Sequence, residues 1–142
     1  MKNWNCSYRF VRLLSLFLVI GLTVSCKKKE PSSDEYIQAI EKMAEQQNAK
    51  ILNDGKNGTG LESVIFTSQN STLTYRYHLS DEAIATVNVN DSNTRKDIIG
   101  TLSNDLKECL VKGNCRLKYM YVSPHDSSFI EIVPDELVNT PQ

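Results

Sequence analysis

The fold of this chain is decided by an alternating run at positions 72–79, which reads TLTYRYHL. Apolar and aromatic residues alternate there with polar ones. Because successive side chains of a β-strand point to opposite faces, the run predicts a strand with one core-facing and one polar face. Residues 61–67 form a second β-like run, and the SQNS segment between the two is typical of a turn. The two runs therefore predict a β-hairpin.

Helical patterns lie on both sides of this hairpin. Residues 34–52 carry apolar side chains at helical spacing, and Ser32 with Glu35 match a capping box. Residues 94–110 repeat the pattern and also open on a capping-box pair, Thr94 with Asp97. We therefore expect two helices, one before the hairpin and one after it.

A second hairpin is expected at the end of the chain. Residues 116–123 and 129–133 are β-like and flank a turn, and residues 83–89 are β-like enough to predict a further short strand. The order of elements predicts an α+β domain over 34–133, with an antiparallel sheet of four to five strands and two helices packed on one face. Residues 134–142 are expected to form a loose tail.

The charge balance changes sharply at Cys26. The chain has 16 basic and 17 acidic residues, but three bases and no acid precede Cys26, which leaves 13 bases against 17 acids, a net charge of −4. This balance disfavours nucleic acid as a partner. The composition, 40% hydrophobic and 23% charged, is typical of an ordinary globular domain.

The first 25 residues have the order of a signal peptide. Lys2, Arg9 and Arg12 precede an uncharged, largely apolar run of 12 residues at 13–24. A helix that spans a bilayer needs about 20 apolar residues, so this run is too short to span well. We expect residues 1–25 to direct export and to be removed.

The end of the apolar run, LTVSC at 22–26, resembles the lipobox of bacterial lipoproteins, although Thr23 stands where leucine is commoner. The resemblance implies that the chain is cut before Cys26 and that acyl chains such as palmitate anchor this cysteine in the lipid bilayer. Residues 26–33 then serve as a lipidated cysteine and tether. Because Lys27 is not aspartate, the analogy with enteric bacteria points to the outer membrane, with the domain facing the periplasm or the exterior. The alternatives are an uncleaved anchor and a secreted protein with an incidental cysteine.

Two cysteines remain for the mature domain. Cys109 and Cys115 flank Gly113 and Asn114, which are typical of a helix end. In an oxidising compartment two such cysteines are expected to form a disulfide. Their spacing does not match a zinc site, and we expect neither a metal nor a cofactor.

The sequence carries no motif that predicts catalysis. His125, Asp126 and the neighbouring serines have the residue types of a triad, but adjacent residues in a tight turn do not align for proton transfer. We therefore expect no enzymatic activity. A candidate binding patch comes instead from Tyr75, Tyr77, Tyr119 and Tyr121, which alternate on two predicted strands. The alternative is that these rings pack beneath the helices.

The lipobox, the first helix, the hairpin, the helix that ends at a cysteine and the final hairpin together resemble the AspS-type pilotin lipoproteins, which carry secretin subunits to the outer membrane. The resemblance lies in the order and length of the elements. It implies a non-catalytic assembly factor that binds an envelope protein. An inhibitor or immunity-type lipoprotein and a structural envelope component remain as alternatives.

Overall fold

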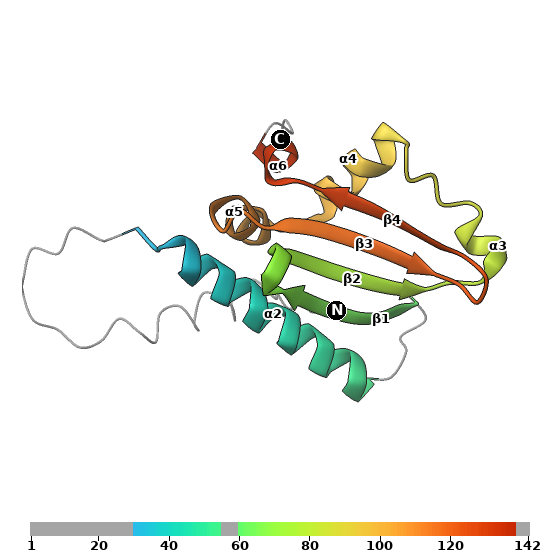
Figure 1. The fold of residues 1–142 in the computed structure, drawn as a ribbon, viewed down its shortest axis with the longest axis horizontal. Helices are drawn as coiled ribbons and strands as arrows, with labels where there is room; N and C mark the ends of the chain where they lie inside the picture. Colours follow the sequence, from blue (N-terminus) through green and yellow to red (C-terminus); the bar gives the residue numbers. More distant parts are fainter. Residues whose placement is uncertain (1–29, 55–59, 139–142) are drawn as a thin grey trace, which may run out of the picture. The chain divides into compact units, whose positions relative to one another are not determined.

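The order of helices and strands confirms the predicted α+β class (Figure 1). A computed structural model describes residues 30–54 and 60–138. The elements are α2 (Ser33–Asp54), β1 (Leu61–Thr67), the short 3-10 helix η1 (Ser68–Asn70), β2 (Thr72–His78), α3 (Asp81–Ile84), α4 (Ser92–Thr101), α5 (Asn104–Lys112), β3 (Arg116–Val122), β4 (Ser127–Ile132) and α6 (Pro134–Val138). Both predicted hairpins are present.

The four strands form one sheet in the order β1-β2-β3-β4, which Figure 1 shows side by side. Within each hairpin the strands pair antiparallel. β2 and β3 pair parallel, with Leu73 beside Leu117, so the prediction of a wholly antiparallel sheet is wrong. The reason is the connection between the hairpins. The helices after β2 return the chain to the end of the sheet where β2 begins, and β3 then runs beside β2 in the same direction.

One face of the sheet carries the core. Its fully buried side chains are Val64, Leu73, Leu117, Ile130 and Ile132. Helix α2 adds Ile40 and α5 adds Leu110 to the same cluster. Burial of these apolar side chains is the main stabilising contribution to the fold, at roughly 25 cal/mol for each Å² removed from water.

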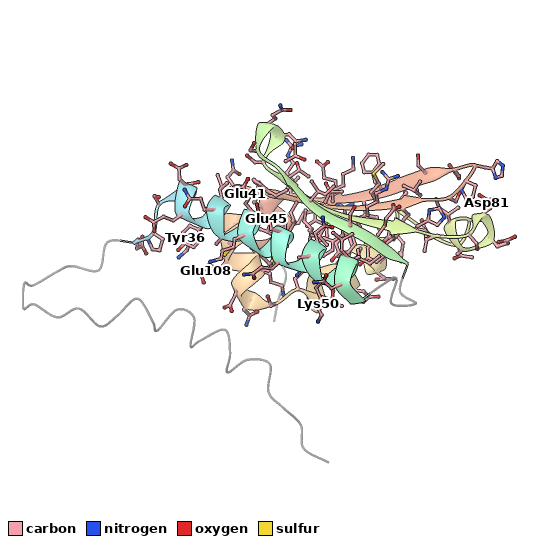
Figure 2. All side chains as sticks on the ribbon, turned by 90° about the horizontal axis from the view of Figure 1, so that it is seen from below. Tyr36, Glu41, Glu45, Lys50, Asp81 and Glu108 are labelled. Carbon is pink, nitrogen blue, oxygen red and sulfur yellow. The ribbon has the colours of Figure 1, made fainter. Side chains whose placement is uncertain are left out.

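The opposite face of the sheet is open. Figure 2 shows α2 on one side of the strands, with no helix drawn over the other side. On that open side Ile65 of β1 is 51% exposed and Phe129 of β4 is 53% exposed. The predicted packing of helices on one face is therefore what the structure shows for the part it describes.

Helix α2 begins close to where the capping pattern places it. The backbone N–H of Glu35 donates to Ser32 Oγ at 3.4 Å, as a capping box requires. Leu52, near the other end of the helix, is 77% exposed. In residues 30–54 and 60–138 no helix is both long and apolar enough to cross a membrane.

The predicted second helix is two helices, α4 and α5. Leu102 leaves the helical conformation, with ψ 137°, and Ser103 then caps α5 by accepting a hydrogen bond from the Leu106 N–H at 3.3 Å. The cap of α4 is Asp91, whose carboxylate accepts from the N–H of Thr94 at 3.1 Å. Thr94 was expected to be the cap; its hydroxyl instead donates to Asp91 Oδ2 at 3.0 Å. Asp91 thus caps the first helix, and Ser103 divides the apolar periodicity of residues 94–110 by starting a second one.

Two further predictions about local structure are wrong. Residues 83–89 do not form a strand, because Ser80 caps the short helix α3 by accepting from the Ala83 N–H at 3.2 Å. Residues 134–138 of the predicted tail form α6, with Pro134 at its first position, where a missing N–H costs nothing. Leu137 of α6 is buried in the core, so the domain extends past residue 133.

Candidate binding surface

The parallel pairing of β2 and β3 brings the four candidate tyrosines together. Tyr75 lies beside Tyr119 and Tyr77 beside Tyr121, all on the helix-bearing face. The ring centroids of Tyr75 and Tyr119 are 5.2 Å apart, those of Tyr119 and Tyr77 are 6.1 Å apart, and those of Tyr77 and Tyr121 are 5.7 Å apart. These distances are within the range of favourable offset stacking. The two strands that carry these tyrosines are therefore neighbours in the sheet. We call these four residues the tyrosine array.

The tyrosine array is half-buried. Tyr75, Tyr119 and Tyr121 pack against the core, and each of the four rings keeps part of its surface in solvent. Neither sequence-based alternative, a patch at the surface or rings packed beneath the helices, therefore holds in full, because three of the rings pack against the core and all four remain partly exposed.

Burial raises the pKa of every hydroxyl in the array above its usual value. Desolvation is the largest cause in each case. For Tyr119 the nearby Tyr77, Tyr75 and Tyr121 add to the effect, and for Tyr75 a hydrogen bond with the Gln47 side chain opposes it. The four phenols are therefore neutral at physiological pH. They offer an aromatic surface with hydroxyls that both donate and accept hydrogen bonds.

Of the residues with triad-like identities, His125 and Ser123 contact the carboxylate of Asp81 rather than that of Asp126. His125 Nδ1 lies 2.8 Å from Asp81 Oδ2 and joins the β3–β4 turn to the start of α3. The pKa of Asp81 is lowered first by a hydrogen bond with the Ser123 side chain and then by the contact with His125. The serine thus contacts the carboxylate, whereas a nucleophile would have to face the other ring nitrogen of the histidine. His78, the other histidine, lies on the open face of the sheet and is exposed.

The predicted disulfide is not formed in the structure, because Cys109 and Cys115 are both free thiols. Cys109 lies on α5 and is half-buried, while Cys115 is packed in the core. Cys115 Sγ instead donates to the Gly113 carbonyl oxygen at 3.3 Å. The two thiols are close enough for Cys109 to add to the raised pKa of Cys115, whose main cause is burial.

The turn between the two cysteines is a Schellman motif. The N–H of Cys115 donates to the Leu110 carbonyl at 2.8 Å, and the N–H of Asn114 donates to the Val111 carbonyl at 3.1 Å. Asn114, with φ 51°, occupies the left-handed position. Gly113 is needed for space, since a Cβ there would lie 2.8 Å from the Cys109 carbonyl oxygen.

If the signal-like sequence exports the chain to an oxidising compartment, as predicted, we expect Cys109 and Cys115 to pair there, with two protons and two electrons passing to the disulfide of an oxidant. Burial raises the pKa of both thiols, so the reaction is expected to need an envelope disulfide catalyst. Protein from the envelope, denatured and alkylated without reductant, should gain no alkyl group at either cysteine, and two groups after reduction. Alkylation of both thiols before reduction would contradict the pairing.

Sequence reasoning missed an interaction that ties the end of the chain to the sheet. Arg95 of α4 forms an ion pair with Glu136 of α6 at 2.8 Å, and its Nη2 also donates to the Glu131 carbonyl oxygen at 2.6 Å. The arginine lowers the pKa of Glu136 through this hydrogen bond. The partners of Arg95 lie 36 and 41 residues further along the chain, and no local pattern relates them.

Cys26 and the predicted signal peptide lie outside the described residues. No protein-family model, no curated protein and no solved structure matches the chain. The likeness to AspS-type pilotins therefore stays a prediction.

Proposed function

We propose that this protein is a bacterial lipoprotein, anchored to the envelope membrane through acylated Cys26, whose domain is a non-catalytic binding or assembly factor. The proposal places the domain on the periplasmic or outer side of the membrane. Its partner is another envelope protein rather than a nucleic acid, in keeping with the acidic balance of the chain after Cys26.

The observation that carries the proposal is the position of Cys26. It stands between the apolar run 13–24 and the lysine cluster 27–29, with the basic residues of a signal peptide at the other end of the run. Helix α2 begins at Ser33, so a short polar tether separates the cysteine from the folded domain. One acyl chain gives marginal membrane binding, whereas two or more give a stable anchor at about 0.8 kcal/mol for each buried CH₂.

The tyrosine array supports a binding role for the domain. Tyrosine is enriched where proteins bind one another, because its ring buries a large area and its hydroxyl keeps a polar contact. Four partly exposed, stacked rings form a rigid surface of this kind, since neighbouring rings restrict one another. No chemical step is required of these groups.

Metabolic labelling with an alkyne analogue of palmitate tests the anchor. In a bacterial host the full-length protein should incorporate the label, and Cys26→Ser should lose it entirely, because acylation needs that thiol. Cys109→Ser is the matched control, with one cysteine removed from the folded domain, and should label like the wild type. A labelled Cys26→Ser variant, or an unlabelled wild type, would refute the proposed anchor.

A further inference from the structure

We propose that the outer edge of β4 is a docking site for an extended peptide segment of a partner protein, which adds to the sheet as a fifth strand. The segment has an apolar side chain opposite Phe129. It also has an acidic side chain two positions further along, on the same face of the added strand. The site is separate from the tyrosine array, and the proposal holds whether or not Cys26 is acylated.

The hydrogen-bond register of β4 shows which backbone groups point outward. Ser123 N–H donates to the Asp126 carbonyl at 2.8 Å, which marks the hydrogen-bonded pair nearest the turn. Because such pairs alternate along an antiparallel ladder, Ser127, Phe129 and Glu131 turn their backbone groups away from β3. The contact of Arg95 with the Glu131 carbonyl agrees with this assignment.

Side chains cap the two ends of this edge. At one end the N–H of Ser127 donates to Asp126 Oδ1 at 2.7 Å. At the other end the Glu131 carbonyl accepts from Arg95 at 2.6 Å. Between these caps, the carbonyl of Ser127, both backbone groups of Phe129 and the N–H of Glu131 have no hydrogen-bond partner in the part of the chain that the structure describes. Such a row of donors and acceptors is a template for another strand.

Beside these groups lies an open hollow of about 420 Å³. Its lining consists of Val89, Asn90 and Arg95 on one side and of Ser127, Ser128, Phe129 and Glu131 of β4 on the other. The edge therefore has room next to it and a wall that would hold an added strand in place.

The exposed side chains define what the segment carries. Phe129 is 53% exposed at this edge, which favours an apolar partner side chain. Lys118 Nζ lies 4.2 Å from the centre of the Phe129 ring and has no carboxylate within ion-pair distance among residues 30–54 and 60–138. Glu131, its cross-strand neighbour, is paired with Arg116 at 3.1 Å. An acidic side chain on the segment would complement this ammonium.

A single strand fits this edge better than a second copy of the chain. Antiparallel pairing of two β4 strands would place both helix-bearing faces on the same side of the joined sheet. Val89, which packs against the core on that side, would then meet its counterpart along the same edge. A single added segment would contact only one copy of the residues that line the hollow beside β4.

The test uses the full-length protein in detergent and a fluorescent nine-residue peptide of alternating threonine and valine, with a central phenylalanine and a glutamate two positions later. We expect saturable binding by fluorescence anisotropy. In amide exchange by NMR, Phe129 and Glu131 should exchange fast in the free protein and slow when the peptide binds. The same peptide with alternate backbone amides N-methylated should bind about tenfold more weakly or worse, since it loses its edge hydrogen bonds.

Three variants make the test specific. Phe129→Pro removes the outward N–H without breaking the ladder to β3, and should weaken binding about tenfold or more. Phe129→Ala keeps the N–H and should weaken binding less. Ile65→Ala alters a residue of matched exposure on β1 and should leave binding unchanged.

Several results would overturn the proposal. They are the absence of saturable binding, equal binding of the N-methylated peptide, and slow exchange of the Phe129 and Glu131 amides before peptide is added. A dimer by light scattering that Phe129→Pro disperses would assign the edge to a second copy instead.

Discussion

Leu110→Ala is expected to lower the free energy of unfolding by about 2–5 kcal/mol, because it leaves a cavity where α5 packs against α2 and the core cluster. Leu110 has 0% of its surface exposed and belongs to the same cluster as Leu73 and Leu117 of the central strands. A cavity there removes contacts from both the helix and the sheet. For a domain of this size such a loss is a large part of the total stability.

Urea denaturation followed by circular dichroism measures this effect. Leu52→Ala is the control, since it makes the same substitution at a residue of α2 that is 77% exposed. The control should change the unfolding free energy by no more than about 0.5 kcal/mol. Equal losses in the two variants would mean that Leu110 is not buried in the core as described.

Gly60→Ala is expected to cost about 2 kcal/mol or more. Gly60 has φ 73°, a conformation that L-residues with a Cβ rarely adopt. A Cβ at this position would also lie 2.7 Å from the backbone carbonyl oxygen of His78. That backbone is held in place, because the N–H of His78 donates to the Gly60 carbonyl at 2.7 Å. The clash therefore cannot be relieved by moving a flexible side chain.

Gly100→Ala is the matched control for this prediction and should have the opposite sign. A Cβ on Gly100 would meet nothing within 4 Å. Because the residue lies in helix α4, alanine should stabilise the domain by up to about 1 kcal/mol. Thermal unfolding of the two variants, followed by circular dichroism, measures whether their stabilities change in opposite directions. A Gly60→Ala variant as stable as the wild type would contradict the left-handed conformation of Gly60 and its close approach to the His78 carbonyl.

The strands could be predicted from the sequence because their signal is local. Side chains in residues 72–78 alternate in character, as strand geometry requires, and residues 61–67 are rich in residue types that favour strands. The parallel pairing of β2 with β3 could not be predicted in the same way. It depends on where three helices return the chain, and no pattern within either strand records that direction.

The helix boundaries show how capping overrides periodicity. Residues 94–110 have one apolar stripe, yet Ser103 caps a new helix in the middle of it. Ser80 likewise starts a helical turn in a stretch of β-like composition. Each of these helix starts depends on a single hydrogen bond from a backbone N–H to a serine hydroxyl. This local interaction cannot be read from the hydrophobic pattern of a longer stretch.

The candidate site was predicted in part. The alternation of Tyr75 and Tyr77, and of Tyr119 and Tyr121, indicated two sets of rings on strand faces, and the structure joins them into one stack. The open edge of β4 could not be predicted, because its free groups belong to the backbone. The wall that faces them comes from residues 89–95, about 35 positions earlier in the chain.

Intact mass of the membrane-purified protein, measured beside Cys26→Ala, is the most direct test of the central claim that Cys26 carries a lipid anchor. We predict a wild-type species that begins at Cys26 and carries the added mass of acyl chains, with no such species in the variant. A wild-type chain that retains residues 1–25 without acylation, or a cleaved form without acyl mass, would contradict the lipoprotein proposal.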